Sequence, residues 1–209
     1  MAKEKKGMNL PNKITCARLV IAVAVLIILC VPWDVIGVNW KTFDVLGVQN
    51  VDLKYIVAGV LFLVGSVTDF LDGYIARKYN LVTDFGKVMD AIADKVLVNG
   101  VLILFACGED PRLHVIIPVI IITRDIVVDS IKMASGNKGK VVAASWPGKI
   151  KTICMMIGLT LLFFYNMPFA FIGHGIPVGD FFVYVATIMS IISGCQYWLA
   201  NKDFIFSEV

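Results

Sequence analysis

The chain has 209 residues, 58% of them hydrophobic, and a formal net charge of +3. Soluble globular domains are only about 45–50% apolar, so this composition excludes an ordinary soluble domain and favours an integral membrane protein. The basic residues form no stripe interleaved with aromatic residues, so the sequence predicts no nucleic-acid partner. The length suits one domain, and we expect residues 1–209 to form a single all-α membrane domain.

Six segments are apolar over the length of about 17–25 residues that a membrane helix needs. They comprise residues 13–32, 53–78, 84–107, 113–135, 147–166 and 178–200. Before them, we expect Lys3–Leu10 to lie along the membrane surface as a juxtamembrane helix. Residues 33–52 contain Trp33 and Trp40, and we expect an interfacial segment there because tryptophan favours the headgroup region. The sequence therefore predicts a protein with six transmembrane helices.

The distribution of lysine and arginine predicts the orientation. Six spans put both termini on one side, and that side carries Lys3, Lys5, Lys6, Lys13, Arg77, Lys78, Lys87, Lys138, Lys140, Lys149, Lys151 and Lys202. The other side has Lys41, Lys54 and Arg112, accompanied by several acidic residues. Because cytoplasmic loops carry the excess of basic residues, we expect a multi-pass protein of the cell membrane with both termini in the cytoplasm.

Acidic residues and glycines gather where the second segment ends and the third begins. The second ends with Asp69, Asp72, Gly73, Ala76 and Arg77, and the third begins with Gly86, Asp90 and Asp94. Spacings of three and four residues put each set on one helical face. A charged side chain in mid-membrane costs about 2.5–3.5 kcal/mol, so such a cluster indicates a functional site. Two such helices packed together would direct four carboxylates into one space, as hard divalent cations require.

This pattern, Asp-x2-Asp-Gly-x2-Ala-Arg-x8-Gly-x3-Asp-x3-Asp, resembles the signature of the CDP-alcohol phosphotransferase family at every fixed position. The six-helix layout also fits that family, so the resemblance covers most of the chain. It implies that Asp69, Asp72 and Asp90 are the main metal ligands. It further implies that Asp94 contacts a second metal and acts as general base on the acceptor hydroxyl. The CDP pocket implied by the resemblance is lined by Asp72, Gly73, Ala76, Arg77 and Gly86.

The residue types suit that chemistry independently. Phosphoryl-type transfer depends on metals that neutralise phosphate charge, best as a pair about 3.5–4 Å apart. Mg²⁺ suits an oxygen-only site, and Mn²⁺ can substitute for it. Glycine lets the backbone approach a nucleotide closely, and Arg77 offers a fork of donors to a phosphate. The alternative is that the aspartates form structural ion pairs with Arg77, Lys87 and Lys95, which would not require the glycines and the spacing together.

Pro11, Asn12, Thr15 and Arg18 resemble the family's entry to its first helix. The resemblance implies that Asn12, Thr15 and Arg18 reach the nucleotide region. On residue type alone, Thr15 also suits a helix cap and Arg18 also suits a side chain that snorkels to the membrane surface. The family also implies a homodimer, although no helix has a Gly-x-x-x-Gly face clear enough to name the interface.

A second polar group predicts the acceptor. Arg124 interrupts the apolar run Val115–Val128, where an unpaired charge would be costly. We interpret Arg124, Ser145, Lys149 and Lys151 as the binding site of a phosphorylated acceptor, because an alcohol such as choline needs no basic cluster. Alternatively, the loop lysines fix topology and bind anionic headgroups, which explains Arg124 poorly. Residues 124–125 and 148–152 resemble the branch of the family whose acceptor is sn-glycerol 3-phosphate.

The resemblance therefore predicts an enzyme that transfers the phosphatidyl group of CDP-diacylglycerol, taken from the membrane lipids, to sn-glycerol 3-phosphate. Its products would be phosphatidylglycerophosphate and CMP. Within the family, an inositol-phosphate acceptor and a cardiolipin synthase are the alternatives. The alternative from another class is a divalent-cation transporter, which predicts polar groups across the full membrane depth. Here the charges crowd toward the cytoplasmic half instead.

Overall fold

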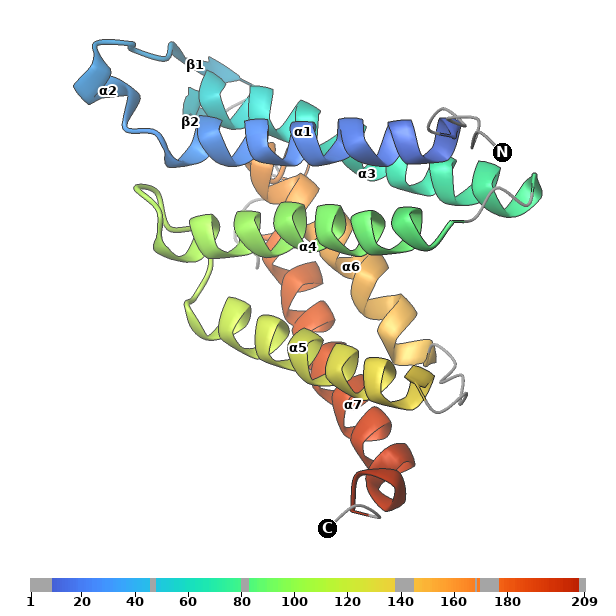
Figure 1. The fold of residues 1–209 in the computed structure, drawn as a ribbon. Helices are drawn as coiled ribbons and strands as arrows, with labels where there is room; N and C mark the ends of the chain where they lie inside the picture. Colours follow the sequence, from blue (N-terminus) through green and yellow to red (C-terminus); the bar gives the residue numbers. More distant parts are fainter. Residues whose placement is uncertain are drawn as a thin grey trace, which may run out of the picture. The chain divides into compact units, whose positions relative to one another are not determined.

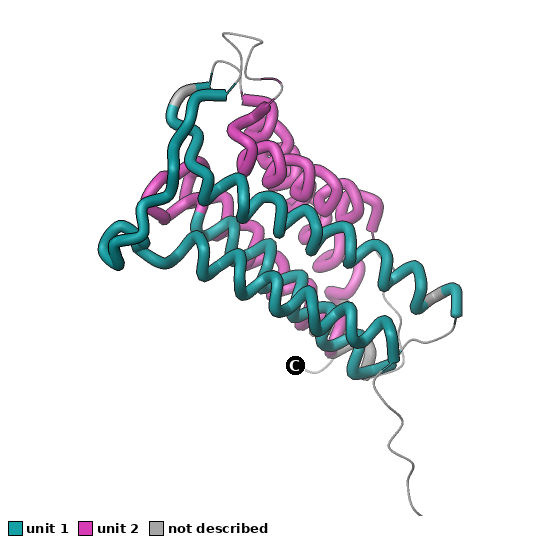
Figure 2. Tube along the Cα trace, turned by 90° about the horizontal axis from the view of Figure 1, so that it is seen from above, with its two compact units in different colours: residues 1–104 teal, residues 105–209 magenta. Residues whose placement is uncertain are grey.

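The computed structural model describes residues 9–45, 48–79, 83–137, 145–167, 169 and 177–206. Over these residues the chain forms seven helices and one two-stranded hairpin (Figure 1). It divides into two compact units, Met1–Leu104 and Phe105–Val209 (Figure 2). That the whole chain acts as one membrane domain stays a prediction.

In unit 1, helix α1 (Leu10–Cys30) packs along helix α3 (Leu53–Lys78) (Figure 1). Pro11 lies in the first turn of α1, where its missing N–H leaves no hydrogen bond unmade. The buried residues of α1 recur every three or four positions and so form one face: Pro11, Asn12, Thr15, Arg18, Ala22 and Val25. The packed face of α1 therefore includes polar residues near its N-terminal end.

Residues 33–52, expected only as an interfacial segment, contain regular structure. Helix α2 (Trp33–Ile36) ends at Gly37, whose φ of 85° is the left-handed conformation that glycine adopts freely. Strands β1 (Thr42–Val45) and β2 (Val48–Asp52) then pair antiparallel. Their β-branched and aromatic residues favour strands.

Helix α4 (Asp84–Cys107) approaches α1 and α3 at two glycines. A Cβ atom added to Gly100 on α4 would lie 2.5 Å from Cδ2 of Leu26 on α1. One added to Gly65 on α3 would lie 3.1 Å from Cδ2 of Leu97 on α4. Small residues of this kind let membrane helices come close together. The glycines thus set the spacing of the three helices that carry the polar motif.

Unit 2 contains helices α5 (Ile116–Asn137), α6 (Trp146–Phe163) and α7 (Val178–Phe206), and α7 packs against both of the others (Figure 1). Ser145 is the N-cap of α6 and accepts a hydrogen bond from Gly148 N at 3.4 Å. Helix α7 comes close to α6 at Gly158, where an added Cβ would lie 2.7 Å from Cγ2 of Val183.

All six segments predicted as helices are helical, with small shifts at their ends. Helix α5 begins at Ile116 rather than at residue 113, because the amides of Arg112 and Leu113 turn back to bond Phe105 O. Among the described residues, three helices are long and apolar enough to cross a membrane by length and composition: Leu10–Cys30, Leu53–Ala76 and Val178–Lys202. The chain is a membrane protein on this evidence, and the count of six spans stays a prediction. Residues 3–8 of the expected juxtamembrane helix lie outside the described residues.

Candidate active site

Three carboxylates converge where α3 ends and α4 begins. Asp69 and Asp72 on α3 and Asp90 on α4 each offer an oxygen atom within 4.8 Å of the other two. The spacing of three residues puts Asp69 and Asp72 on the same face of α3. The Asp72 side chain is only 3% exposed, whereas those of Asp69 and Asp90 are half-buried. This donor set, made of oxygen atoms alone, is the kind that hard divalent cations bind.

Arg18 of α1 binds all three carboxylates. Its Nη1 donates to Asp69 Oδ1 and, at 2.8 Å, to Asp90 Oδ1, while Nη2 donates to Asp72 Oδ2. The Arg18 side chain is 1% exposed, so it neither reaches solvent nor snorkels to a membrane surface. Burying a charge is costly unless it is paired, and here the single guanidinium offsets part of the charge of the three carboxylates. One side chain thereby ties α1 to α3 and α4.

The carboxylates still suit a metal ion with Arg18 beside them. The guanidinium contacts one oxygen of each carboxylate, and each carboxylate has a second oxygen atom that can accept a ligand bond. A cation at this position would therefore lie next to the guanidinium and share the same three aspartates. The residues fit a divalent metal on this ground.

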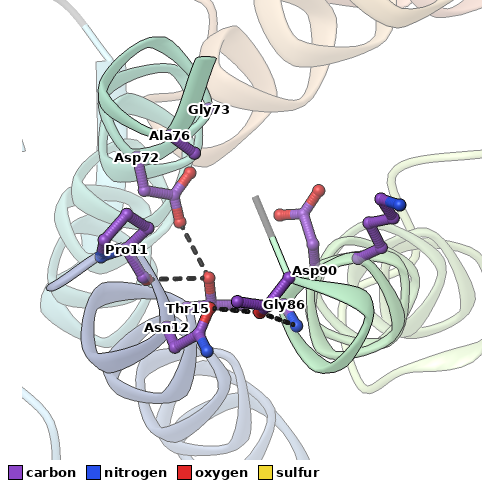
Figure 3. Close-up of a pocket in the computed structure, with 10 residues that line it drawn as sticks. Pro11, Asn12, Thr15, Asp72, Gly73, Ala76, Gly86 and Asp90 are labelled. Carbon is purple, nitrogen blue, oxygen red and sulfur yellow. Dashed lines mark hydrogen bonds between the residues drawn. The ribbon is translucent and has the colours of Figure 1, made fainter. Parts of the chain in front are cut away.

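A pocket opens beside the carboxylates, between α1, α3 and α4. It is lined by Pro11, Asn12, Thr15, Asp72, Gly73, Ala76, Thr83, Gly86, Lys87 and Asp90. Figure 3 shows the carboxylates of Asp72 and Asp90 directed from different helices into the space above Thr15. The small residues Gly73, Ala76 and Gly86 leave the backbone of α3 and α4 accessible from the pocket.

Polar contacts from α1 shape the floor of this pocket (Figure 3). Thr15 lies inside α1 and is therefore no helix cap. Its Oγ1 lies 3.0 Å from Asp72 Oδ2 and 3.1 Å from Pro11 O, the two acceptors that its one proton can reach. Thr83 caps the start of α4, because its Oγ1 accepts from Gly86 N at 3.0 Å. The same hydroxyl donates to Asn12 Oδ1 at 3.1 Å. Thr83 was not among the site residues predicted from the sequence, although a threonine directly before a helical segment is an N-cap signal.

In unit 2, Asp125 connects two of the residues assigned to the acceptor. Arg124 Nη1 donates to Asp125 Oδ1 at 3.0 Å, and Lys151 Nζ donates to the same oxygen. Lys149 is exposed and its Nζ lies 5.4 Å from the ring centroid of Trp146. The structure therefore joins Arg124 to Lys151 through Asp125 and directs Lys149 elsewhere.

Residues 8–198 match the family model described as CDP-alcohol phosphatidyltransferase. The chain belongs to this family. It is 36% identical over 195 residues to a protein of Bacillus subtilis named CDP-diacylglycerol–glycerol-3-phosphate 3-phosphatidyltransferase, covering 93% of this chain and 96% of the relative. Proteins with the same name in Rickettsia bellii and Haemophilus influenzae are each 34% identical, over 94% and 73% of this chain and 97% and 81% of their own lengths. The family predicted from the aspartate motif is confirmed.

Two other residues predicted for the site, Asp94 and Arg18, are not among the residues that line the pocket. Asp94 lies one turn beyond Asp90 on α4 and is half-buried, but it is not part of the group of three carboxylates. Arg18 contacts the carboxylates and is not among the pocket-lining residues. The side chain of Arg77 lies outside the described part of the chain.

Replacing Gly86 with alanine should lower the free energy of unfolding by about 1–3 kcal/mol, the usual cost of overpacking. The added Cβ would lie 2.6 Å from Asn12 Oδ1 and 3.1 Å from Thr83 Oγ1. Denaturant titration in detergent measures the effect. The same substitution in an Asn12→Ala background should cost little, because the obstructing oxygen is gone. An equal loss of unfolding free energy in both backgrounds would contradict the close approach of Gly86 to Asn12.

Arg18→Gln should lower the free energy of unfolding by about 3–5 kcal/mol, the range for breaking a buried ion pair, because three neighbouring carboxylates lose their shared cation. Lys87→Gln is the matched control. Lys87 pairs with Asp84 at 2.9 Å, and both side chains are largely exposed, so its loss should cost well under about 1 kcal/mol. Similar losses for the two variants in the same titration would refute the role given to Arg18.

Proposed function

We propose that the protein transfers the phosphatidyl group of CDP-diacylglycerol to sn-glycerol 3-phosphate, forming phosphatidylglycerophosphate and CMP. The observation that carries this proposal is the group of Asp69, Asp72 and Asp90 beside a pocket lined by small residues. The Bacillus subtilis relative supports the choice of substrates, since it matches almost the full chain and its name states them.

In this proposal Mg²⁺ is the cofactor, with Mn²⁺ able to substitute, and two ions bind per site. Asp69, Asp72 and Asp90 would hold the ions through carboxylate oxygens, and Asp94 would reach the second. A bound metal would neutralise the charge of the diphosphate and of the departing CMP. Arg18 would keep the three carboxylates close together despite their mutual repulsion.

CDP would bind in the pocket of unit 1. Its lining residues Asn12, Thr15, Gly73, Ala76 and Gly86 combine hydrogen-bonding groups with small side chains that leave room for the nucleotide. Arg77 follows Ala76 on α3 and would add a forked donor for a phosphate. Arg18 would act on the nucleotide indirectly, through the carboxylates that it binds.

Asp94 would be the general base. It would take the proton of the C1 hydroxyl of sn-glycerol 3-phosphate while that oxygen attacks the phosphorus that carries diacylglycerol. The bond from this phosphorus to the CMP oxygen would then break, and CMP would leave. A carboxylate is a suitable base when it is held within hydrogen-bond reach of the hydroxyl.

The acceptor's phosphate would bind to Arg124, Ser145 and Lys151, and the exposed side chain of Lys149 would turn from the Trp146 ring to reach it. Arg124 and Lys151 meet at Asp125, which concentrates positive charge in unit 2. Ser145 caps the 18-residue helix α6, whose N-terminal amides favour an anion. An unphosphorylated alcohol would make no use of this cluster.

We also propose that all six apolar helices span the cell membrane, with the termini and the active site on the cytoplasmic side. The excess of lysine and arginine in the loops of that side supports this orientation. A homodimer and a single membrane domain, as in the family resemblance, belong to the same proposal.

The test of the function is CMP release by the purified protein from CDP-diacylglycerol with different acceptors. Glycerol 3-phosphate should support release, EDTA should abolish it, and Mg²⁺ should restore it. CMP release with inositol phosphate but not with glycerol 3-phosphate would refute the proposed acceptor. Metal uptake into sealed vesicles without nucleotide would favour a transporter.

Asp90→Asn and Asp94→Asn should each lower the rate of CMP release on the order of 1,000-fold or more, since loss of metal binding or of the base removes several kcal/mol of transition-state stabilisation. Asp84→Asn is the matched control, because Asp84 is on the same helix and its side chain is 98% exposed. It should retain normal activity. Activity retained by both Asp90→Asn and Asp94→Asn would contradict the mechanism.

A further inference from the structure

Three residues of α7 face the side chain of Arg124. Ser193 Oγ accepts a hydrogen bond from Arg124 Nη2 at 2.6 Å. The ring centroid of Tyr197 lies 5.9 Å from Arg124 Cζ. Between them, Gly194 lies close against the stem of Arg124, because an added Cβ would lie 3.0 Å from Arg124 Cγ. The polar end and the aliphatic stem of Arg124 are thus both in contact with one face of α7.

The orientation of the Ser193 hydroxyl is fixed by a second hydrogen bond. Ser193 Oγ donates its only proton to Ser190 O at 3.1 Å, so its acceptor lone pairs remain for Arg124. Ser193 is completely buried, which excludes competing water. The hydroxyl therefore offers Arg124 an acceptor of fixed position.

Asp125 binds the other terminal nitrogen atom of the Arg124 guanidinium. Arg124 Nη1 donates to Asp125 Oδ1, and the same oxygen also accepts from Lys151 Nζ. With one Nη bound to Ser193 and the other to Asp125, the plane of the guanidinium is set. One carboxylate that serves two cations favours a further anion beside them.

Tyr197 extends this arrangement to two more polar groups. Its hydroxyl accepts a hydrogen bond from the backbone amide of Ser145 at 3.3 Å. Its ring also lies 5.4 Å from Lys132 Nζ. Helix α7 therefore contacts both Arg124 and the N-cap of α6, the two features that the proposed acceptor site combines.

We propose that Ser193, Gly194 and Tyr197, the α7 seat, are positioning residues that orient Arg124 toward the phosphate of the acceptor. This inference rests on the proposed function. An arginine recognises a phosphate through the planar fork of its donors, so the direction of the fork decides the strength of the contact. Fixing that direction before binding removes the entropy cost of ordering a long side chain.

Ser193→Ala tests the seat, with Ser190→Ala as the matched control. The two serines are on the same helix, both are completely buried, and for Ser190 Oγ no hydrogen-bond partner is found among the described residues. Ser193→Ala should raise the KM for glycerol 3-phosphate by up to about tenfold, because the released Arg124 side chain would then have to be ordered when the acceptor binds. The KM for CDP-diacylglycerol should stay unchanged, whereas the thermal midpoint should fall, because a buried donor of Arg124 loses its acceptor. Ser190→Ala should match the wild type in all three measurements.

Gly194→Ala is a second variant, and it separates positioning from folding. Alanine favours a helix more than glycine does, so α7 itself should not be weakened. The added methyl group would push the Arg124 stem away, and the KM for glycerol 3-phosphate should rise while the KM for CDP-diacylglycerol stays constant. The positioning role of the α7 seat would be refuted if the acceptor KM is unchanged in both Ser193→Ala and Gly194→Ala. An equal rise in the KM values of both substrates would refute it as well.

The wild-type protein separates failure of this inference from failure of the proposed function. If glycerol 3-phosphate releases no CMP but inositol phosphate does, the proposed acceptor is wrong and the same KM comparison is made with inositol phosphate. A selective effect of Ser193→Ala there would still support the seat. If only an acceptor without phosphate reacts, the seat is overturned as well.

Discussion

The arrangement of helices α1, α3 and α4 in unit 1 depends on one buried arginine that binds three carboxylates. Asp69, Asp72 and Asp90 come from two helices, and their like charges would separate those helices if nothing compensated them. Arg18 supplies the compensating charge from a third helix, so the electrostatic balance and the helix packing are the same interaction. The pocket lies directly beside this group and shares Asp72 and Asp90 with it. Its shape therefore depends on the ion pairs.

Much of this unit was predictable from the sequence, because its signals are local. Apolar length located the helices, and spacings of three and four residues put the aspartates on facing helix surfaces. The motif also identified the family. The partner of the aspartates was harder to predict, since Arg18 lies 51 residues before Asp69 and only packing brings the two together. The hairpin at 42–52 was missed because its strands of four and five residues give a weak alternating pattern.

The contacts within the basic cluster of unit 2 were also hard to predict from the sequence. Lys149 and Lys151 look equivalent in the sequence, but residues two apart on a helix point in different directions. Lys151 accordingly meets Asp125, whereas Lys149 lies over Trp146. Ser193 and Arg124 are 69 residues apart, and no local pattern relates them. Asp125 was visible beside Arg124, yet only the structure reveals that it also binds Lys151.

The contact between Gly100 and Leu26 has a mechanical consequence for the chemistry at the opposite end of α4. A helix rises about 1.5 Å per residue, so Gly100 is about 15 Å from Asp90 along a stiff rod. A side chain added at Gly100 would push α4 away from Leu26 on α1. The resulting tilt of α4 would move Asp90 near the other end of the helix. A larger residue at Gly100 is therefore expected to disturb the position of Asp90 as well as the local packing against Leu26.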